Sequence, residues 1–137
     1  MHFHSCRHAT HAVLPAPPPV AQIQSGDKML KIISAFNFRK DKPYEECRRY
    51  WLEEHRKVVE SNLPECRRYV QNIAVPISGR SWPFDGFAEI WFDDMAAIRR
   101  SFEGPLAEQL RQDELVFSLG GDKSSWVIVN EDPVFDR

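Results

Sequence analysis

The 137-residue sequence has few cysteines, almost no net charge and no long apolar run. Three cysteines are too few for the disulfide framework of a secreted domain, so we expect a reducing, cytoplasmic compartment. Eighteen Lys and Arg against twenty Asp and Glu give a formal net charge of -2, which gives no reason to expect a nucleic acid partner. No apolar stretch approaches the roughly 20 residues that a membrane-spanning helix requires. We therefore expect one soluble domain that binds neither nucleic acid nor membrane.

The first 28 residues differ in composition from the rest of the chain. Four of the ten prolines lie between residues 15 and 19, and four of the five histidines lie within the first 11 residues. Because a proline run fixes φ and removes backbone donors, we expect a disordered extension ahead of a folded domain at residues 29–137. The histidines and Cys6 are residue types that bind zinc, nickel or copper. Without a rigid framework they predict adventitious metal affinity rather than a metal site.

Hydrophobic periodicity in the remaining chain predicts the order strand, helix, strand, strand, helix, strand. Asp41 and Pro43 indicate the start of the first helix, as a cap and as an early-turn proline. Asp93 or Asp94 is expected to cap the second. The expected strands are residues 30–38, 66–75, 87–92 and 126–129. The expected helices are residues 44–62, a segment through Phe102, and a short continuation at residues 106–110.

This order predicts an α+β fold of the ferredoxin-like type, βαββαβ. Two β-α-β units in succession form a four-stranded antiparallel sheet with both helices on one face. Aromatic residues occur on several of the expected strands. The uncovered face is therefore expected to pack against another protein, most simply a second copy of the chain.

His55 is the only histidine of the expected core. Cys47, Trp51 and His55 are four residues apart, which places all three on the apolar side of the first helix. An imidazole with an ordinary pKa of ~6.5 can transfer a proton near neutral pH. The alternative is a buried neutral histidine that is hydrogen-bonded to a backbone carbonyl, which is the more common use of such a position.

Aromatic residues predict a surface for a hydrophobic or aromatic ligand. Phe36, Trp51, Tyr69 and Trp91 are the candidates, although aromatic residues at this spacing are also typical of a plain core. The expected domain contains no glycine-rich phosphate loop, no zinc-ligand spacing and no Gly-x-Ser-x-Gly motif. We therefore expect no nucleotide, flavin or metal cofactor.

Four segments, taken in order, resemble the EthD family, named after ethyl tert-butyl ether degradation. They are YWLEEH at residues 50–55, LPECRRYVQN at 63–72, DGFAEIWFD at 85–93 and DELVF at 113–117. The resemblance covers about residues 29–130. Arg56 and Lys57 depart from it, because relatives usually have a small residue and a proline after the histidine.

The resemblance implies a homodimer of the dimeric α+β-barrel superfamily. Its two sheets would face each other, and a small-molecule pocket would lie between each sheet and its own helices. His55 matches the histidine of the family's first helix. Asp113 and Phe117 would be further site residues, Asp113 as a second polar group. For Asp113, capping a turn or pairing with Arg111 is an equally good explanation.

Two functions follow from these observations. The first is a cofactor-independent enzyme that acts by proton transfer on a small hydrophobic carbonyl or phenolic compound, as an isomerase, dehydratase or decarboxylase. The second is a non-catalytic ligand-binding or accessory protein of an oxygenase or degradation pathway. Haem binding, which occurs elsewhere in the superfamily, is a third alternative.

Overall fold

The computed structural model describes residues 28–120 and 125–137, so the expected extension lies almost entirely outside the described residues. In chain order the elements are β1 Leu30–Phe36, α2 Tyr44–Arg49, η1 Tyr50–His55, α3 Arg56–Asn62, β2 Arg68–Ile73, β3 Gly86–Phe92, α4 Met95–Phe102, α5 Pro105–Glu114 and β4 Ser125–Asn130. Here η1 is a π-helical segment that joins two α-helical ones. The predicted order of strands and helices is confirmed.

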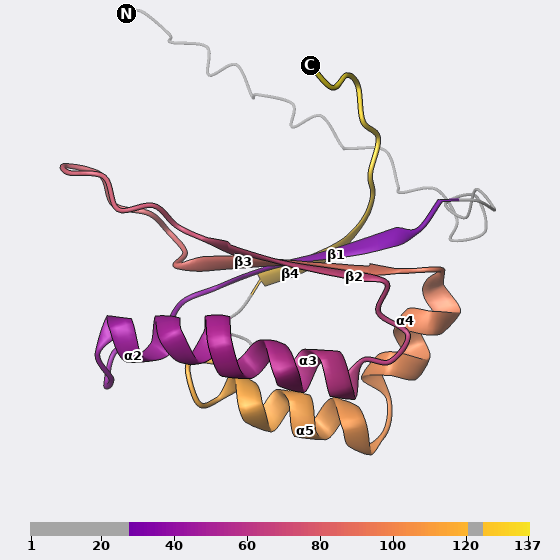
Figure 1. Ribbon diagram of the computed structural model, residues 1–137, viewed down its shortest axis with the longest axis horizontal. Coiled ribbons are helices and arrows are strands. Elements are labelled where there is room, and N and C mark those ends of the chain that lie inside the picture. The colour runs from indigo at the N-terminus through magenta and orange to yellow at the C-terminus, as the bar shows by residue number, and fades with distance from the viewer. Residues whose placement is uncertain (1–27, 121–124) are drawn as a thin grey trace, which may run out of the picture.

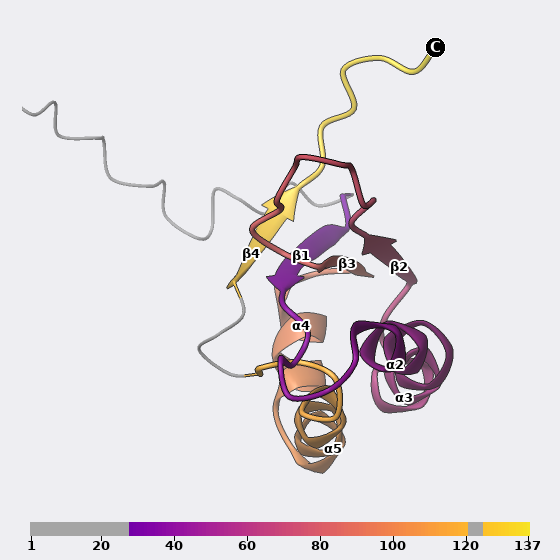
Figure 2. The same ribbon diagram turned by 90° about the vertical axis from the view of Figure 1, so that its left-hand side faces the viewer.

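The four strands form one antiparallel sheet, seen nearly edge-on in Figure 1, and their order is β2-β3-β1-β4. All the helices lie on one side of this sheet, while the C-terminal segment leaves from the other side (Figure 2). The α+β, ferredoxin-like βαββαβ fold predicted from the sequence is therefore confirmed. Among the described residues, no helix has the length and apolar character needed to cross a lipid bilayer.

Alternation along β1 assigns its side chains to the two faces of the sheet. Leu30, Ile32 and Phe36 are buried on the helix side, where a half-buried strand places its apolar residues. Lys31 lies on the opposite, open face, directly across from Trp91 of β3. The register therefore decides which side chains can reach the space between sheet and helices.

Two apolar clusters fill that space. One gathers around the fully buried Phe92, between the sheet and helices α3, α4 and α5. The other surrounds Trp51, whose side chain packs edge-on against Phe36 at 4.9 Å between ring centroids. Gly86 sits under these two rings, and an added Cβ would lie 2.7 Å from Phe36 Cζ. A larger residue at position 86 would therefore displace this aromatic cluster.

The first helical region differs from its prediction at its start and in its middle. Pro43 is the N-cap residue, and Asp41 instead pairs with Arg39 at 2.6 Å, so the prediction that Asp41 caps this helix is wrong. A guanidinium two residues away is a stronger partner for a carboxylate than a helix end. The π-helical turn interrupts what periodicity predicts as one α-helix. The second region follows its prediction better, since the Asp94 side chain accepts from Ala97 N at 2.8 Å.

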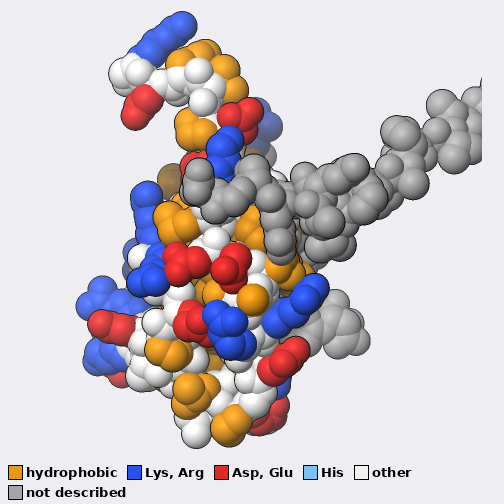
Figure 3. All heavy atoms as spheres, turned by 90° about the vertical axis from the view of Figure 1, so that its right-hand side faces the viewer, with side chains coloured by type: hydrophobic (Ala, Val, Ile, Leu, Met, Phe, Trp, Pro, Cys, Tyr) orange, Lys and Arg blue, Asp and Glu red, His pale blue; other side chains and the backbone are white. Residues whose placement is uncertain are grey.

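Helix α5 is longer than its prediction and reaches Glu114. Its start follows from Gly104, whose φ of 93° favours glycine, and from Pro105 in the first turn. Acidic and basic side chains are intermingled on the molecular face seen in Figure 3, without a large patch of one sign. This distribution agrees with the interspersed charges of the sequence.

Candidate active site

The π-helical segment brings two side chains to a single carboxylate. Tyr50 Oη donates to Asp113 Oδ1 at 2.6 Å, and His55 Nδ1 lies 2.7 Å from Asp113 Oδ2. Residues five apart point about 140° away from each other on an α-helix of 3.6 residues per turn. A π-helix bonds residue i to residue i+5 and so places such residues on one side. The π conformation therefore allows Tyr50 and His55 to share Asp113.

Asp113 lies in the last turn of α5, across the helical layer from η1. Its side chain is 15% exposed, and both of its oxygens are used by Tyr50 and His55. Arg111, the alternative partner considered for Asp113, instead donates to Glu108 at 3.1 Å. The structure thus brings the two predicted catalytic residues, His55 and Asp113, into direct contact.

His55 is almost completely buried, at 4% exposure. Burial lowers the pKa of the imidazole below its ordinary value, although the hydrogen bond and charge of Asp113 act in the opposite direction. The effect of burial is the larger one, because little water reaches the ring. A neutral ring that donates to Asp113 from Nδ1 leaves Nε2 unprotonated. Nε2 is then a base, with its tautomer fixed by the carboxylate.

Tyr50 keeps its proton in this arrangement. Its hydrogen bond to Asp113 is the main cause that raises its pKa to about 12. A neutral phenol carries no positive charge that could balance the carboxylate. Its O–H group nevertheless satisfies the second carboxylate oxygen of Asp113 and holds it in place. The orientation of Asp113 is therefore set from both sides.

His55 lines a cavity of about 70 Å³ between the sheet and the helices. Most of the other lining side chains are apolar or aromatic: Phe36, Trp51, Val59, Leu63, Tyr69, Ala88, Ile90, Phe102, Leu110 and Phe117. Typical ligand pockets measure roughly 300–1,000 Å³. In this conformation the cavity accommodates the reacting part of a small molecule rather than a whole aromatic compound.

The structure places four of the five predicted substrate-binding residues around this cavity, namely Phe36, Trp51, Tyr69 and Phe117. The Phe117 ring lies 4.7 Å from the His55 ring. Trp91 is the exception. It lies on the open face of the sheet, with the Arg68 guanidinium over its ring at 4.7 Å. The structure therefore does not bring Trp91 to this cavity, because the register of β3 turns it away from the helices.

Glu114 also lines the cavity, and the sequence did not single it out. Burial raises the pKa of its carboxyl to about 7. Within residues 28–120 and 125–137, its carboxylate has neither a hydrogen bond nor an ion pair. One signal was present in the sequence: Ala107, Leu110 and Glu114 follow the spacing of one helix face, and the first two are buried.

Within residues 28–120 and 125–137, no group of three or more His, Cys, Asp or Glu side chains is arranged to hold a metal ion. His55 and Asp113 are engaged with each other instead. The chemistry that this arrangement can perform with its own side chains is proton transfer.

Comparison with known proteins agrees with this fold. The EthD domain model matches residues 39–119, more than half of the chain. The chain belongs to the EthD family. The resemblance found in the sequence is thereby confirmed, and the matched range includes His55, Asp113 and Glu114. No protein of curated function matches the sequence.

Solved structures with low sequence identity share the fold of this EthD-family chain. An EthD-family protein of Bacillus halodurans has a TM-score of 0.62 at 14% identity, over 76% of this chain and 99% of its own. A hydroxynitrile lyase of Passiflora edulis has a TM-score of 0.61 at 11% identity, over 80% and 99%. A dimeric protein of Bacteroides fragilis has a TM-score of 0.56 at 14% identity, over 75% and 96%.

Proposed function

We propose that this EthD-family protein is a cofactor-independent enzyme that transfers a proton on a small hydrophobic carbonyl or phenolic compound. The observation that carries the proposal is the 2.7 Å contact between His55 and Asp113 at the wall of an apolar cavity. A buried histidine with a purely structural role more often bonds to a backbone group. Here a carboxylate holds one ring nitrogen, and the other nitrogen is left for a ligand.

The proposed step begins with Nε2 of His55 as the base. It accepts a proton from an acidic C–H or O–H group of the bound compound, and Asp113 stabilises the imidazolium that forms. The imidazolium then returns the proton to a different atom, which completes an isomerisation, or to a leaving group, which completes an elimination. The aromatic walls exclude water from the exchange. General acid–base catalysis of this kind contributes ~10²–10⁴-fold to a rate.

We further propose that the protein is a homodimer joined through the open faces of two sheets. Phe87 and Val127 lie on that face and are 36% and 51% exposed. The dimeric Bacteroides fragilis protein, which has the same fold, supports a dimer. A reducing, cytoplasmic location fits the low cysteine content of the sequence.

The second candidate function is a non-catalytic carrier or accessory protein of a degradation pathway. The small volume and mostly apolar lining of the cavity favour it, since such a space can hold part of a ligand without reacting with it. The lyase of Passiflora edulis, whose fold is shared, supports catalysis instead. A measurement of turnover separates the two functions.

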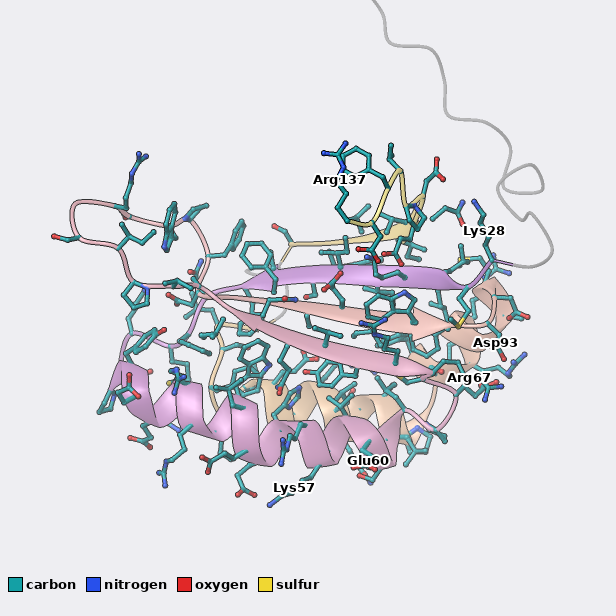
Figure 4. The ribbon with its side chains drawn as sticks, turned by 45° about the horizontal axis from the view of Figure 1, so that its top comes forward. Lys28, Lys57, Glu60, Arg67, Asp93 and Arg137 are labelled. Atoms are coloured by element: carbon teal, nitrogen blue, oxygen red, sulfur yellow. The ribbon has the colours of Figure 1, made fainter. Side chains whose placement is uncertain are left out.

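The test is a panel of lactones, quinones and phenols assayed with the wild type and with His55→Ala. We expect His55→Ala to lower turnover by ~10²–10⁴-fold while thermal unfolding shows a folded protein. Lys57→Ala is the matched control, since Lys57 is an exposed residue of the same helical region that points away from the sheet (Figure 4). Full turnover by His55→Ala would contradict the proposal. Binding without turnover in the wild type would favour the carrier.

A further inference from the structure

Glu114 reaches the cavity of His55 from a different helix. His55 ends η1, whereas Glu114 ends α5 directly after Asp113. The two neighbouring carboxyl groups of α5 have different surroundings. Asp113 accepts from Tyr50 and contacts His55, whereas the Glu114 carboxyl has no hydrogen-bonding partner among the described residues. A half-buried carboxyl without a hydrogen-bonding partner loses part of its hydration, so it calls for an explanation other than stability.

The groups around Glu114 determine its protonation. Burial is the main cause that raises its pKa, Asp113 adds repulsion, and Arg111 on the solvent side of the same helix opposes both. From the sheet, Tyr69 faces the cavity as a neutral phenol, because burial raises its pKa. From η1, His55 faces it as a neutral imidazole. Among the described residues that line the cavity there is no lysine or arginine.

We propose that Glu114 is a second catalytic residue, which donates a proton to the carbonyl oxygen of an uncharged substrate while His55 removes a proton from the adjacent carbon. This inference rests on the proposed function and names the substrate class of the same site. A neutral acid and a neutral base that line one cavity can act on a substrate at the same time. Neither needs a metal or a cofactor to do so.

The proton transfer balances within the site. His55 Nε2 takes the proton from the carbon, and the electron pair of that C–H bond forms a C=C double bond. The π electrons of the carbonyl group move to oxygen and bond to the proton that leaves Glu114. The products are an enol, an imidazolium and a carboxylate. In a conjugated enol, return of the enol proton to Glu114 and of the imidazolium proton to a different carbon shifts the C=C double bond, re-forms the carbonyl group, restores both residues and leaves an isomer.

The charges around the cavity also favour substrates of one charge state over another. Among the described residues that line the cavity no side chain is cationic, and Asp113 already places a negative charge behind His55. An anionic compound would be repelled and would lose its hydration without compensation. A ketone, lactone or enone that is neutral at its reacting end fits instead.

The first part of the test measures the protonation of Glu114 in the full-length protein. Carbon-13 NMR of the glutamate carboxyl groups follows each of them through a pH titration. The Glu114 signal is identified by its loss in Glu114→Gln, and the exposed Glu60, which points away from the sheet in Figure 4, provides the control variant Glu60→Gln. We expect the Glu114 carboxyl to titrate near pH 7, within about one unit. An ordinary value near 4.5 would overturn the proposal.

The second part measures exchange of α-protons for deuterium in a panel of neutral ketones and lactones, together with 4-oxopentanoate and its methyl ester. We expect exchange at least tenfold slower with Glu114→Gln than with the wild type or Glu60→Gln, and abolished with His55→Ala. We also expect the methyl ester to exchange at least tenfold faster than 4-oxopentanoate. Unchanged exchange in Glu114→Gln, or equal rates for ester and anion, would overturn this inference alone. Unchanged exchange in His55→Ala, or none in the wild type, would overturn the proposed function and the inference with it.

Discussion

Two glutamates lie on opposite sides of the same sheet in contrasting surroundings. Glu89, on the open face, accepts from Lys31 Nζ at 2.9 Å and from Asn72 Nδ2 at 3.0 Å, and these hydrogen bonds lower its pKa. Glu114, on the helix side, has no donor among the described residues, and burial raises its pKa to about 7. The paired carboxylate serves the fold, whereas the unpaired one in a cavity is available for chemistry.

On the open face, the buried ammonium of Lys31 is paired with carboxylates and takes no part in the proposed chemistry. Lys31 is only 8% exposed, and its ammonium contacts Glu89 and lies 3.8 Å from Glu131. It also lies over the Trp91 ring, at 4.9 Å from the centroid. A second copy can cover this face without leaving the ammonium unpaired, which agrees with the proposed dimer.

The largest effect is expected where one carboxylate serves two side chains. Asp113→Ala removes the acceptor of Tyr50 and of His55, each a hydrogen bond to a charged group. We expect a loss of about 3–5 kcal/mol in the free energy of unfolding, measured by urea denaturation. We also expect the pKa of His55 to fall further, because Asp113 is the group that raises it. An unchanged His55 pKa would show that the two residues are not coupled.

Glu114→Gln is expected to change how the free energy of unfolding depends on pH. The folded-state pKa of Glu114 is raised from 4.5 to about 7, so the wild type loses stability as pH rises through this interval. The variant should match the wild type at pH 4 and exceed its stability above pH 7 by up to about 3 kcal/mol. Denaturant unfolding at both pH values measures this difference. A variant that is less stable than the wild type at pH 8 would contradict the assignment.

Glu89→Gln should act in the opposite direction and by less. The substitution leaves Lys31 with the more distant Glu131 as its only remaining carboxylate among the described residues. We expect a loss of about 1–3 kcal/mol near neutral pH, because a nearly buried ammonium loses its closest partner. Stability that is equal to that of the wild type would mean that water or another chain already solvates Lys31.

The smallest effect is expected at an exposed pair. Arg67 and Asp93 lie side by side at the sheet end (Figure 4), joined at 2.8 Å with both side chains more than half exposed. Arg67→Ala should change the free energy of unfolding by less than about 1 kcal/mol, as is usual for surface ion pairs.

A chain that starts at Met29 should likewise keep its melting temperature, since β1 begins at Leu30. A large loss in the shortened chain would place part of residues 1–28 in the fold.

The fold could be predicted from the sequence because its signals are local. The alternation around Ile32 indicates the first strand, and Pro76, Gly79 and Pro83 separate the second from the third. Trp91 was misplaced because residues 87–92 carry aromatic side chains on both faces, so alternation alone does not say which side meets the helices. Only the pairing of Trp91 with Lys31 settles this.

The candidate site could be predicted in part. His55 stood out as the lone histidine of an apolar helix face, and Asp113 as part of a family motif. Tyr50 was missed because it lies five positions before His55, and an α-helix would point the two apart. Glu114 was missed because its helix is rich in charged residues that mostly face solvent. Burial, which changes the chemistry of its carboxyl, comes from packing between distant segments.

The most direct test of the account is the protonation of the His55 ring. Nitrogen-15 NMR of the full-length protein, with the His55 signals identified by their absence in His55→Ala, reports which nitrogen carries the proton. We predict a neutral ring at pH 7, with the proton on Nδ1, Nε2 unprotonated and a pKa below 6.5. An imidazolium at pH 7, or a neutral ring with its proton on Nε2, would contradict the role of His55 as the base.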